Sequence, residues 1–130
     1  MHRNTLLSIV SVVIILTAIG VYTLSSYRTS YVIESFNAQP INGKYPLEAK
    51  IIINYGPFGG SEPLNGSIVW ILKNGKFYAM NFTDANGVAK FYVPPGNYTV
   101  YFVQFKYYVK NVVISNTGVR IILNYAYLYK

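Results

Sequence analysis

Cysteine is absent from this chain of 130 residues, and only four acidic residues and one histidine are present. The lack of cysteine excludes a disulfide scaffold and a thiolate metal site. Charged residues make up 12% of the chain, about half of their usual share in soluble domains. Disorder is excluded as well, because 52% of the residues are apolar and 17% are aromatic, whereas disordered chains are poor in such residues.

The few ionisable side chains form no recognisable catalytic pattern. His2 precedes a long apolar segment, which excludes Ser-His, Cys-His and His-cluster sites in the rest of the chain. Asp84-Ala85-Asn86-Gly87 resembles the start of a calcium loop but lacks the later acidic ligands, so a hairpin turn is favoured. The acids lie in separate segments, and no two stand out as a glycosidase-type pair: Glu34, Glu48, Glu62 and Asp84. We therefore expect no enzymatic activity, no metal and no cofactor.

Residues 5–24 form an apolar run without a charge, TLLSIVSVVIILTAIGVYTL. As a helix this run spans roughly 30 Å, the thickness of a bilayer's hydrocarbon core. A buried core helix is disfavoured because no other segment has a helical pattern, and a cleaved signal peptide has a shorter apolar region of about 7–15 residues. The run predicts a signal-anchor helix over residues 5–27, which contacts membrane lipid through residues 5–24 and follows a short cytoplasmic leader, residues 1–4.

The orientation of this helix follows from the rest of the chain, because its basic flanks are too similar to decide it. Asn65-Gly66-Ser67, Asn81-Phe82-Thr83 and Asn97-Tyr98-Thr99 match the acceptor pattern for N-glycosylation. Asn65, Asn81 and Asn97 are therefore candidate glycosylation sites. Three matches within residues 65–99 favour a cytoplasmic N-terminus and an extracytoplasmic domain at the cell surface, residues 28–130.

Beyond Arg28 the pattern changes to short β-rich runs that are separated by turn residues. Asn74-Gly75 is the strongest hairpin signal, because both residues accept a positive φ. Strands at this even spacing predict an antiparallel β-sandwich of about 100 residues. The expected strands are residues 31–36, 47–55, 67–72, 76–81, 88–93, 97–105, 107–114 and 119–127.

Three stretches of these residues resemble the carboxypeptidase regulatory-like, or transthyretin-like, family. They are GSIVWIL at residues 66–72, TDANGVAKF at residues 83–91 and PGNYTV at residues 95–100. They follow the family's Gly-x-x-Val strand, Thr-Asp-x-x-Gly turn and Gly-x-Tyr-x-Val strand. The resemblance implies an Ig-like or transthyretin-like β-sandwich and says almost nothing about activity, since such modules are accessory domains in many unrelated proteins. The residues that carry the motif are Thr83, Asp84, Gly87, Gly96 and Tyr98.

The strands show two apolar faces where a half-exposed sheet usually has one apolar and one polar face. The expected core is Val69, Ile71, Ala89, Phe91, Val93, Tyr98, Val100 and Phe102, and Trp70 is expected to join it. The apolar residues of the second face are explained either by a two-sheet core with tyrosines at its edges or by an outer patch that binds a protein partner. Residues 119–130 are typical of an edge strand that awaits a partner. The candidate assembly surface is Tyr101, Val103, Phe105, Tyr125, Tyr127 and Tyr129.

The formal net charge of +7 arises mainly from a shortage of acids. The lysines are dispersed and form no tract for nucleic acid, so no nucleic-acid partner is expected, although attraction to an anionic glycan or envelope layer is an alternative. Few carboxylates and abundant Asn and Tyr suit an acidic exterior, where Asp and Glu lose their charge near pH 4. This composition resembles that of surface proteins of thermoacidophilic archaea.

Three functions agree with this layout. The first is a membrane-anchored structural protein of the cell surface that assembles through its β-domain, with a pilin-like filament subunit as a special case. The pilin comparison is weakened because Met1-His2-Arg3 carries no processing site and Ser8 stands where pilin helices usually have an acid. The second is an accessory single-pass subunit of a larger membrane complex. The third is a surface glycan-binding module that uses tyrosines and Trp70 as stacking platforms.

The shortage of acids predicts that acid affects stability little. We expect the thermal unfolding midpoint, followed by circular dichroism, to change little between about pH 2 and about pH 7, since few carboxylates gain protons. A steep loss of stability below about pH 4 would contradict the acid-tolerance hypothesis.

Overall fold

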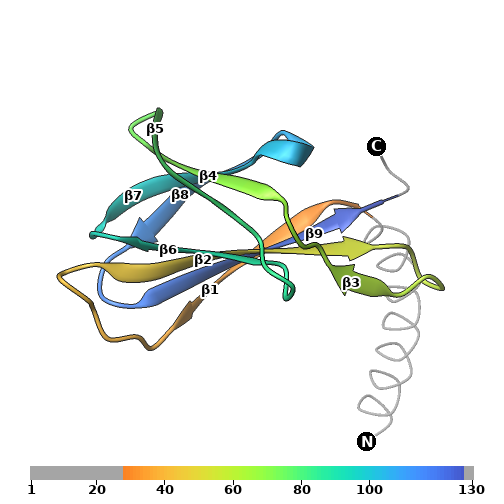
Figure 1. The fold of residues 1–130 in the computed structure, drawn as a ribbon, viewed down its shortest axis with the longest axis horizontal. Helices are drawn as coiled ribbons and strands as arrows, with labels where there is room; N and C mark the ends of the chain where they lie inside the picture. Colours follow the sequence, from red (N-terminus) through yellow and green to blue (C-terminus); the bar gives the residue numbers. More distant parts are fainter. Residues whose placement is uncertain (1–27, 128–130) are drawn as a thin grey trace, which may run out of the picture.

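The computed structural model describes residues 28–127, which form two β-sheets that pack face to face (Figure 1). The five-stranded sheet contains, in spatial order, β1 (Ser30–Phe36), β9 (Gly118–Ala126), β2 (Tyr45–Asn54) and β3 (Ser61–Pro63), and β6 (Val88–Val93) also pairs with β2. The four-stranded sheet has the order β5 (Lys76–Phe82), β4 (Ile68–Lys73), β7 (Gly96–Phe102) and β8 (Tyr107–Ile114). The predicted all-β class is therefore confirmed.

Three of the predicted features lie outside the described residues. This applies to the leader, residues 1–4, to the membrane helix, residues 5–27, and to Tyr129. Within residues 28–127 no helix is long and apolar enough to cross a membrane.

Most predicted strands agree with the observed ones, and two have the predicted bounds, β6 and β8. The strand predicted to end at residue 105 ends at Phe102, because the chain turns into the one-turn 3₁₀ helix η1 (Val103–Phe105) and Lys106 then adopts a left-handed φ of 52°. Strand β3 has only three residues, all exposed, and shows no pattern that predicts it.

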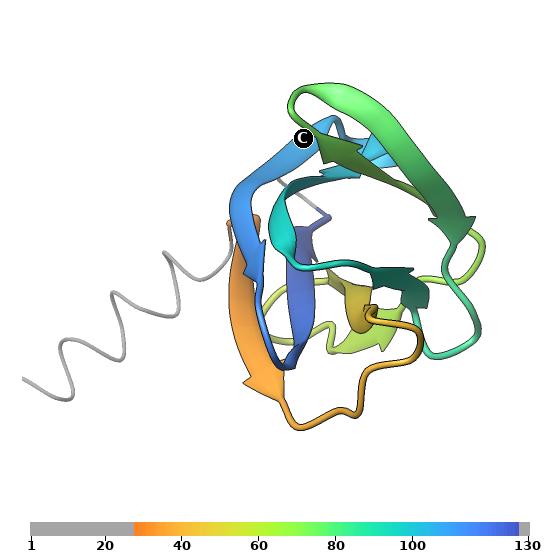
Figure 2. The same cartoon turned by 90° about the vertical axis from the view of Figure 1, so that its left-hand side faces the viewer.

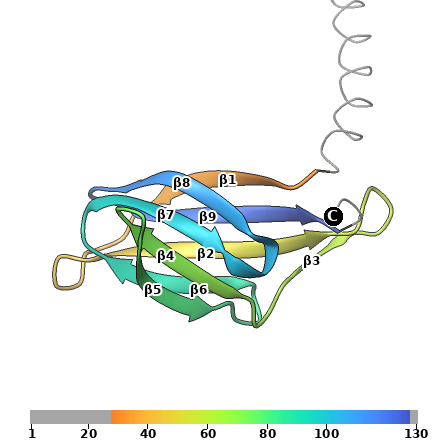
Figure 3. The ribbon, with the colours of Figure 1, turned by 90° about the horizontal axis from the view of Figure 1, so that it is seen from above.

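The pairing of β2 with β9 departs from the predicted antiparallel architecture. β9 is parallel to β2, from Leu47 opposite Val119 to Asn54 opposite Ala126, and antiparallel to β1 on its other side. Strand β9 is thus a central strand, and the prediction of an edge strand is wrong for residues 119–126. Among the described residues β1 pairs only with β9, so β1 is an edge of the five-stranded sheet (Figure 3).

The core lies between the two sheets, as the view along the strands shows (Figure 2). All eight predicted core residues are buried, from Val69 to Phe102. The five-stranded sheet adds Leu47, Ile51, Ile121 and Leu123. Trp70 is an exception to the prediction. Its neighbours Val69 and Ile71 face the core, so Trp70 points to the outer face of its strand.

The motif turn at residues 83–87 connects the two sheets, so it is not the hairpin that the sequence predicted: β5 and β6 belong to different sheets. The carboxylate Oδ1 of Asp84 accepts the backbone N–H groups of Asn86 at 2.9 Å and Val88 at 3.0 Å. Gly87 has a φ of 77° and its carbonyl accepts the N–H of Ile51 at 2.8 Å. The turn therefore holds the start of β6 against the middle of β2.

Gly87 provides a test of the contact between this turn and β2. Gly87→Ala forces a left-handed alanine and places its Cβ 2.6 Å from the carbonyl oxygen of Ile51. Gly43 has a similar φ of 74° but no atom near its Cβ position, so Gly43→Ala isolates the backbone strain. We expect chemical denaturation to show a loss of about 1 kcal/mol for Gly43→Ala and about 3 kcal/mol for Gly87→Ala. Equal losses would mean that the close approach at Gly87 does not constrain the fold.

Candidate functional site

The outer surface of the four-stranded sheet carries a row of large apolar side chains. Met80 pairs with Trp70, Trp70 with Tyr101 and Tyr101 with Tyr108, so the row crosses all four strands. Residues opposite each other on neighbouring strands share a face of the sheet. We call this surface the aromatic face and define it by Trp70, Phe77, Met80, Phe82, Tyr101 and Tyr108.

The rings of the aromatic face contact one another. Tyr101 stacks on Tyr108 with ring centroids 4.0 Å apart, and Trp70 meets Tyr101 at 5.8 Å and Phe77 at 5.5 Å in edge-to-face arrangements. A hydrogen bond with Tyr108, together with burial, raises the pKa of Tyr101 above its ordinary value. The indole N–H of Trp70 is buried without a hydrogen-bond partner in the described part of the chain. A buried donor without a partner costs stability.

The side chains at the rim of the row remain exposed to solvent. The exposed fractions are 54% for Phe77, 45% for Met80, 54% for Phe82 and 50% for Tyr108. None of the four acids lies on this face, since Glu34, Glu48 and Glu62 belong to the other sheet and Asp84 to the turn between the sheets. A sheet surface that faces water normally carries polar residues. The aromatic face is therefore a candidate interaction surface.

The outer surface of the five-stranded sheet contrasts with it. Arg120 donates to the nearly buried carboxylate of Glu48 at 2.9 Å and 2.8 Å, and reaches Glu34 at 3.4 Å. Glu48 also lies opposite Lys90 in the sheet, and the guanidinium of Arg120 lies 5.3 Å from the ring of Phe36. This surface thus pairs two acids with an arginine and has a polar character that the aromatic face lacks.

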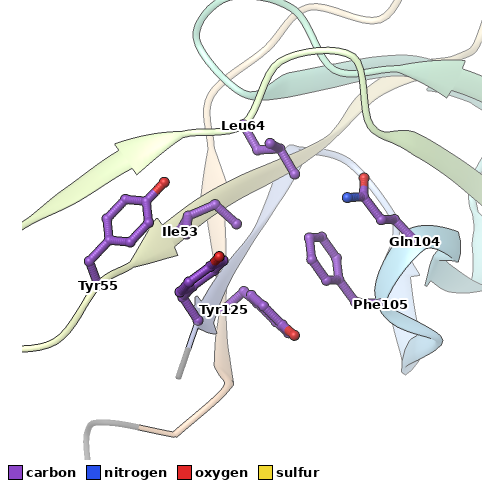
Figure 4. Close-up of a pocket in the computed structure, with 7 residues that line it drawn as sticks. Ile53, Tyr55, Leu64, Gln104, Phe105 and Tyr125 are labelled. Atoms are coloured by element: carbon purple, nitrogen blue, oxygen red, sulfur yellow. The ribbon is translucent and has the colours of Figure 1, made fainter. Parts of the chain in front are cut away.

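A pocket of about 390 Å³ lies at the end of the sandwich where β2 and β9 end (Figure 4). Its ring pairs are Phe105 with Tyr125, 4.2 Å apart, and Tyr55 with Tyr127, 5.4 Å apart. The hydrogen bond from the Tyr55 hydroxyl to Glu62 raises the pKa of Tyr55. The pocket is lined by Ile53, Tyr55, Leu64, Gln104, Phe105, Tyr125 and Tyr127.

The structure divides the predicted assembly surface between two places. Tyr101 lies on the aromatic face, whereas Phe105, Tyr125 and Tyr127 line the pocket at the end of the sandwich. Val103 is half-buried in η1. Sequence reasoning missed Phe77, Met80, Phe82 and Tyr108 as part of this surface. Met80 and Phe82 alternate with Asn81, but only the irregular register at Ile71 and Leu72 brings Phe77 to the same face.

The three candidate glycosylation sites differ in their surroundings. Asn65 and Asn97 have exposed side chains. Asn81 is also exposed, but its amide nitrogen, the atom to which a glycan attaches, donates to the carbonyl of Lys90 at 3.0 Å and so links the two sheets. The hydroxyl of Thr83 in the same acceptor pattern is buried and donates to the carbonyl of Leu64.

The motif residues Gly96 and Tyr98 have structural positions. Tyr98 is buried and its hydroxyl donates to the carbonyl of Pro94 at 2.5 Å. A Cβ on Gly96 would lie 3.4 Å from the Tyr98 ring, which is an ordinary contact, so the packing of this ring does not require a glycine. Among residues 28–127 no three His, Cys, Asp or Glu side chains lie close enough together to hold a metal ion.

Comparisons with known proteins do not assign this chain to a family. No protein-family model matches it, and no curated protein matches its sequence. The resemblance of residues 66–105 to the carboxypeptidase regulatory-like family therefore remains a prediction that depends on the motifs quoted above.

The environment of Tyr98 predicts sensitivity to alkali. Burial, followed by the nearby Tyr78, raises the pKa of Tyr98 above 10.0 in the folded protein. Its contribution to stability is therefore complete below the unfolded pKa of about 10 and is lost as the pH rises through the folded pKa. We expect Tyr98→Phe to lose less unfolding free energy than the parent between about pH 9 and about pH 11. The exposed Tyr92→Phe serves as the control, and parallel profiles for Tyr98→Phe and the parent would refute the assignment.

Proposed function

We propose that this chain is a membrane-anchored structural protein of the cell surface, whose transthyretin-like β-sandwich binds other protein chains through the aromatic face. One observation carries the proposal: a sheet surface in contact with water exposes Phe77, Met80, Phe82 and Tyr108 and holds no carboxylate. Exposed apolar patches of this kind, rich in aromatic residues and methionine, are typical of protein interfaces.

The size of the aromatic face favours contacts between anchored molecules. Complete burial of a Phe or Met side chain contributes about 1.5–3 kcal/mol, so four half-exposed side chains contribute roughly 4 kcal/mol. Association of free molecules costs roughly 4–15 kcal/mol, so this contact alone is weak in solution. Anchoring in one membrane raises the effective concentration of the partners and makes a weak lateral contact sufficient.

A filament requires two different surfaces on each subunit, because only a head-to-tail contact repeats without closing. The edge strand β1 offers the second surface, since Val32 and Ile33 are exposed there and β1 pairs only with β9 in the described residues. In the pilin-like case, the aromatic face of one copy therefore packs against the β1 edge of the next copy.

A glycan-binding module is the weaker alternative. Stacked rings suit a sugar platform, but sugar hydroxyls also need hydrogen-bonding side chains beside the rings. Here Ile68 and Leu72 flank Trp70 on the same strand, and the residue opposite Trp70 is Met80. These aliphatic neighbours favour a protein partner. An accessory subunit of a membrane complex uses the same surface with an unlike partner.

Matched tyrosine substitutions on the two sheets test the proposal. Tyr108→Lys places a charge on the aromatic face, whereas Tyr92→Lys places the same charge on the other sheet. The two tyrosines have similar exposed fractions, 50% for Tyr108 and 42% for Tyr92. After extraction in mild detergent, size-exclusion chromatography with light scattering should show assemblies for the parent and Tyr92→Lys and mainly monomers for Tyr108→Lys. If the assemblies contain other proteins besides this chain, the result favours the role of an accessory subunit of a membrane complex.

The unfolding midpoints of both variants control for folding damage. If Tyr108→Lys is folded and assembles like the parent, the aromatic face is not the interface.

A further inference from the structure

Phe58 is the most exposed apolar side chain in the described part of the molecule. It lies at the tip of the loop between β2 and β3, in the sequence Gly56-Pro57-Phe58-Gly59-Gly60. The loop is tightly closed: the N–H of Gly59 donates to the carbonyl of Gly56 at 3.2 Å and the N–H of Tyr55 donates to that of Gly60 at 3.0 Å. A Cβ on Gly59 would lie 2.6 Å from the carbonyl oxygen of Tyr55. The backbone therefore holds the Phe58 ring out in solvent.

This loop lies at the end of the sandwich where the described chain begins. The hydroxyl oxygen of Thr29 accepts the N–H of Ala126 at 3.2 Å, and the N–H of Tyr127 donates to the carbonyl of Asn54 at 3.0 Å, directly before the loop. In Figure 3 the start of β1, the end of β9 and the β2–β3 loop are together at one end of the molecule. The entry of the chain and Phe58 therefore share one end of the domain.

The distance to the membrane follows from the proposed anchor. The predicted membrane helix ends at residue 27 and β1 begins at Ser30. The two residues between them span at most about 7 Å. The polar headgroup region on each side of a bilayer is of similar thickness, about 5–8 Å. This end of the sandwich is therefore held against the headgroups.

The side chains at this end suit a membrane interface. Besides Phe58 they include Tyr55 and the exposed Tyr127, whose rings lie 5.4 Å apart. Aromatic rings are enriched at the headgroup level of membranes. The nearby acid Glu62 accepts the hydroxyl of Tyr55 and lies on β3 behind the loop. A single ring on a narrow glycine-proline loop fits a lipid surface better than a protein partner, which needs a contiguous patch.

We infer that the loop of residues 56–60 inserts Phe58 into the headgroup region of the membrane that anchors the chain, as a second contact with lipid besides the helix. This inference depends on the membrane anchor of the proposed function. Together the two contacts fix the tilt of the β-sandwich on the membrane.

Tryptophan fluorescence of the full chain in phosphatidylcholine vesicles tests this contact. In a Trp70→Phe background, Phe58→Trp reports on the loop, and Phe77→Trp is a matched control because Phe77 is also strongly exposed but follows the Asn74-Gly75 turn at the opposite end. Lipids brominated near the headgroup end of the acyl chain should quench Phe58→Trp at least about twofold and shift its emission to the blue. The same brominated lipids should not quench Phe77→Trp. Equal quenching of the two variants, or none in either, overturns the inference.

Flotation of the same vesicles separates this inference from the anchor. If the full chain does not float with the lipid, the membrane anchor is wrong and the loop contact is refuted with it. If the chain floats but Phe58→Trp is not quenched, only the loop contact is refuted. Circular dichroism of each variant confirms that the β-sandwich is intact.

Discussion

The parallel pairing of β2 with β9 is the constraint on which the rest of the domain depends. It places the last strand between the first strand and the second, so the five-stranded sheet is complete only when the end of the chain has arrived. The same register brings Arg120 opposite Glu48, so that the two form an ion pair on the outer surface, and it points Ile121 and Leu123 into the core. Because a parallel connection needs a long crossover, the whole four-stranded sheet lies between these two strands in sequence.

This arrangement also explains why the two outer surfaces differ. Strand β9 brings Arg120 to the five-stranded sheet, where it forms ion pairs with Glu34 and Glu48, so half of the acids of the chain have a partner within the domain. The four-stranded sheet has no such ion pair among the described residues, and the row across its outer surface consists of aromatic and aliphatic residues, with Asn97 and Thr99 beside it on β7. An isolated soluble domain gains nothing from this exposure, whereas a domain with partners on the same membrane gains a contact surface.

The sequence predicted the features that depend on local pattern. Turn residues such as Asn74-Gly75 and the alternation around Tyr98 and Val100 located strands and core, because φ preferences and the two-residue period are local properties. Strand partners are not local, so the central position of β9 and the open edge of β1 were not predictable. Trp70 was misplaced because Ile68 to Leu72 is apolar on both faces, and a continuous apolar run does not reveal which residues face inward.

The position of the two ends of the described chain, near Thr29 and Tyr127, connects the two surfaces proposed here. Strand β1 begins, and strands β2 and β9 end, at the end of the domain that contains Thr29, Tyr127 and Phe58. The five-stranded sheet therefore stands upright if this end faces the membrane (Figure 3). The aromatic face then points sideways, along the membrane, where neighbouring molecules are found. If the helix is the only anchor, the domain can rotate about residues 28–29. The more orientations it samples, the smaller is the fraction of time in which the aromatic faces of two neighbours can meet. A second lipid contact at Phe58 removes much of this freedom before partners bind, so less entropy is lost on association and a weak surface becomes effective.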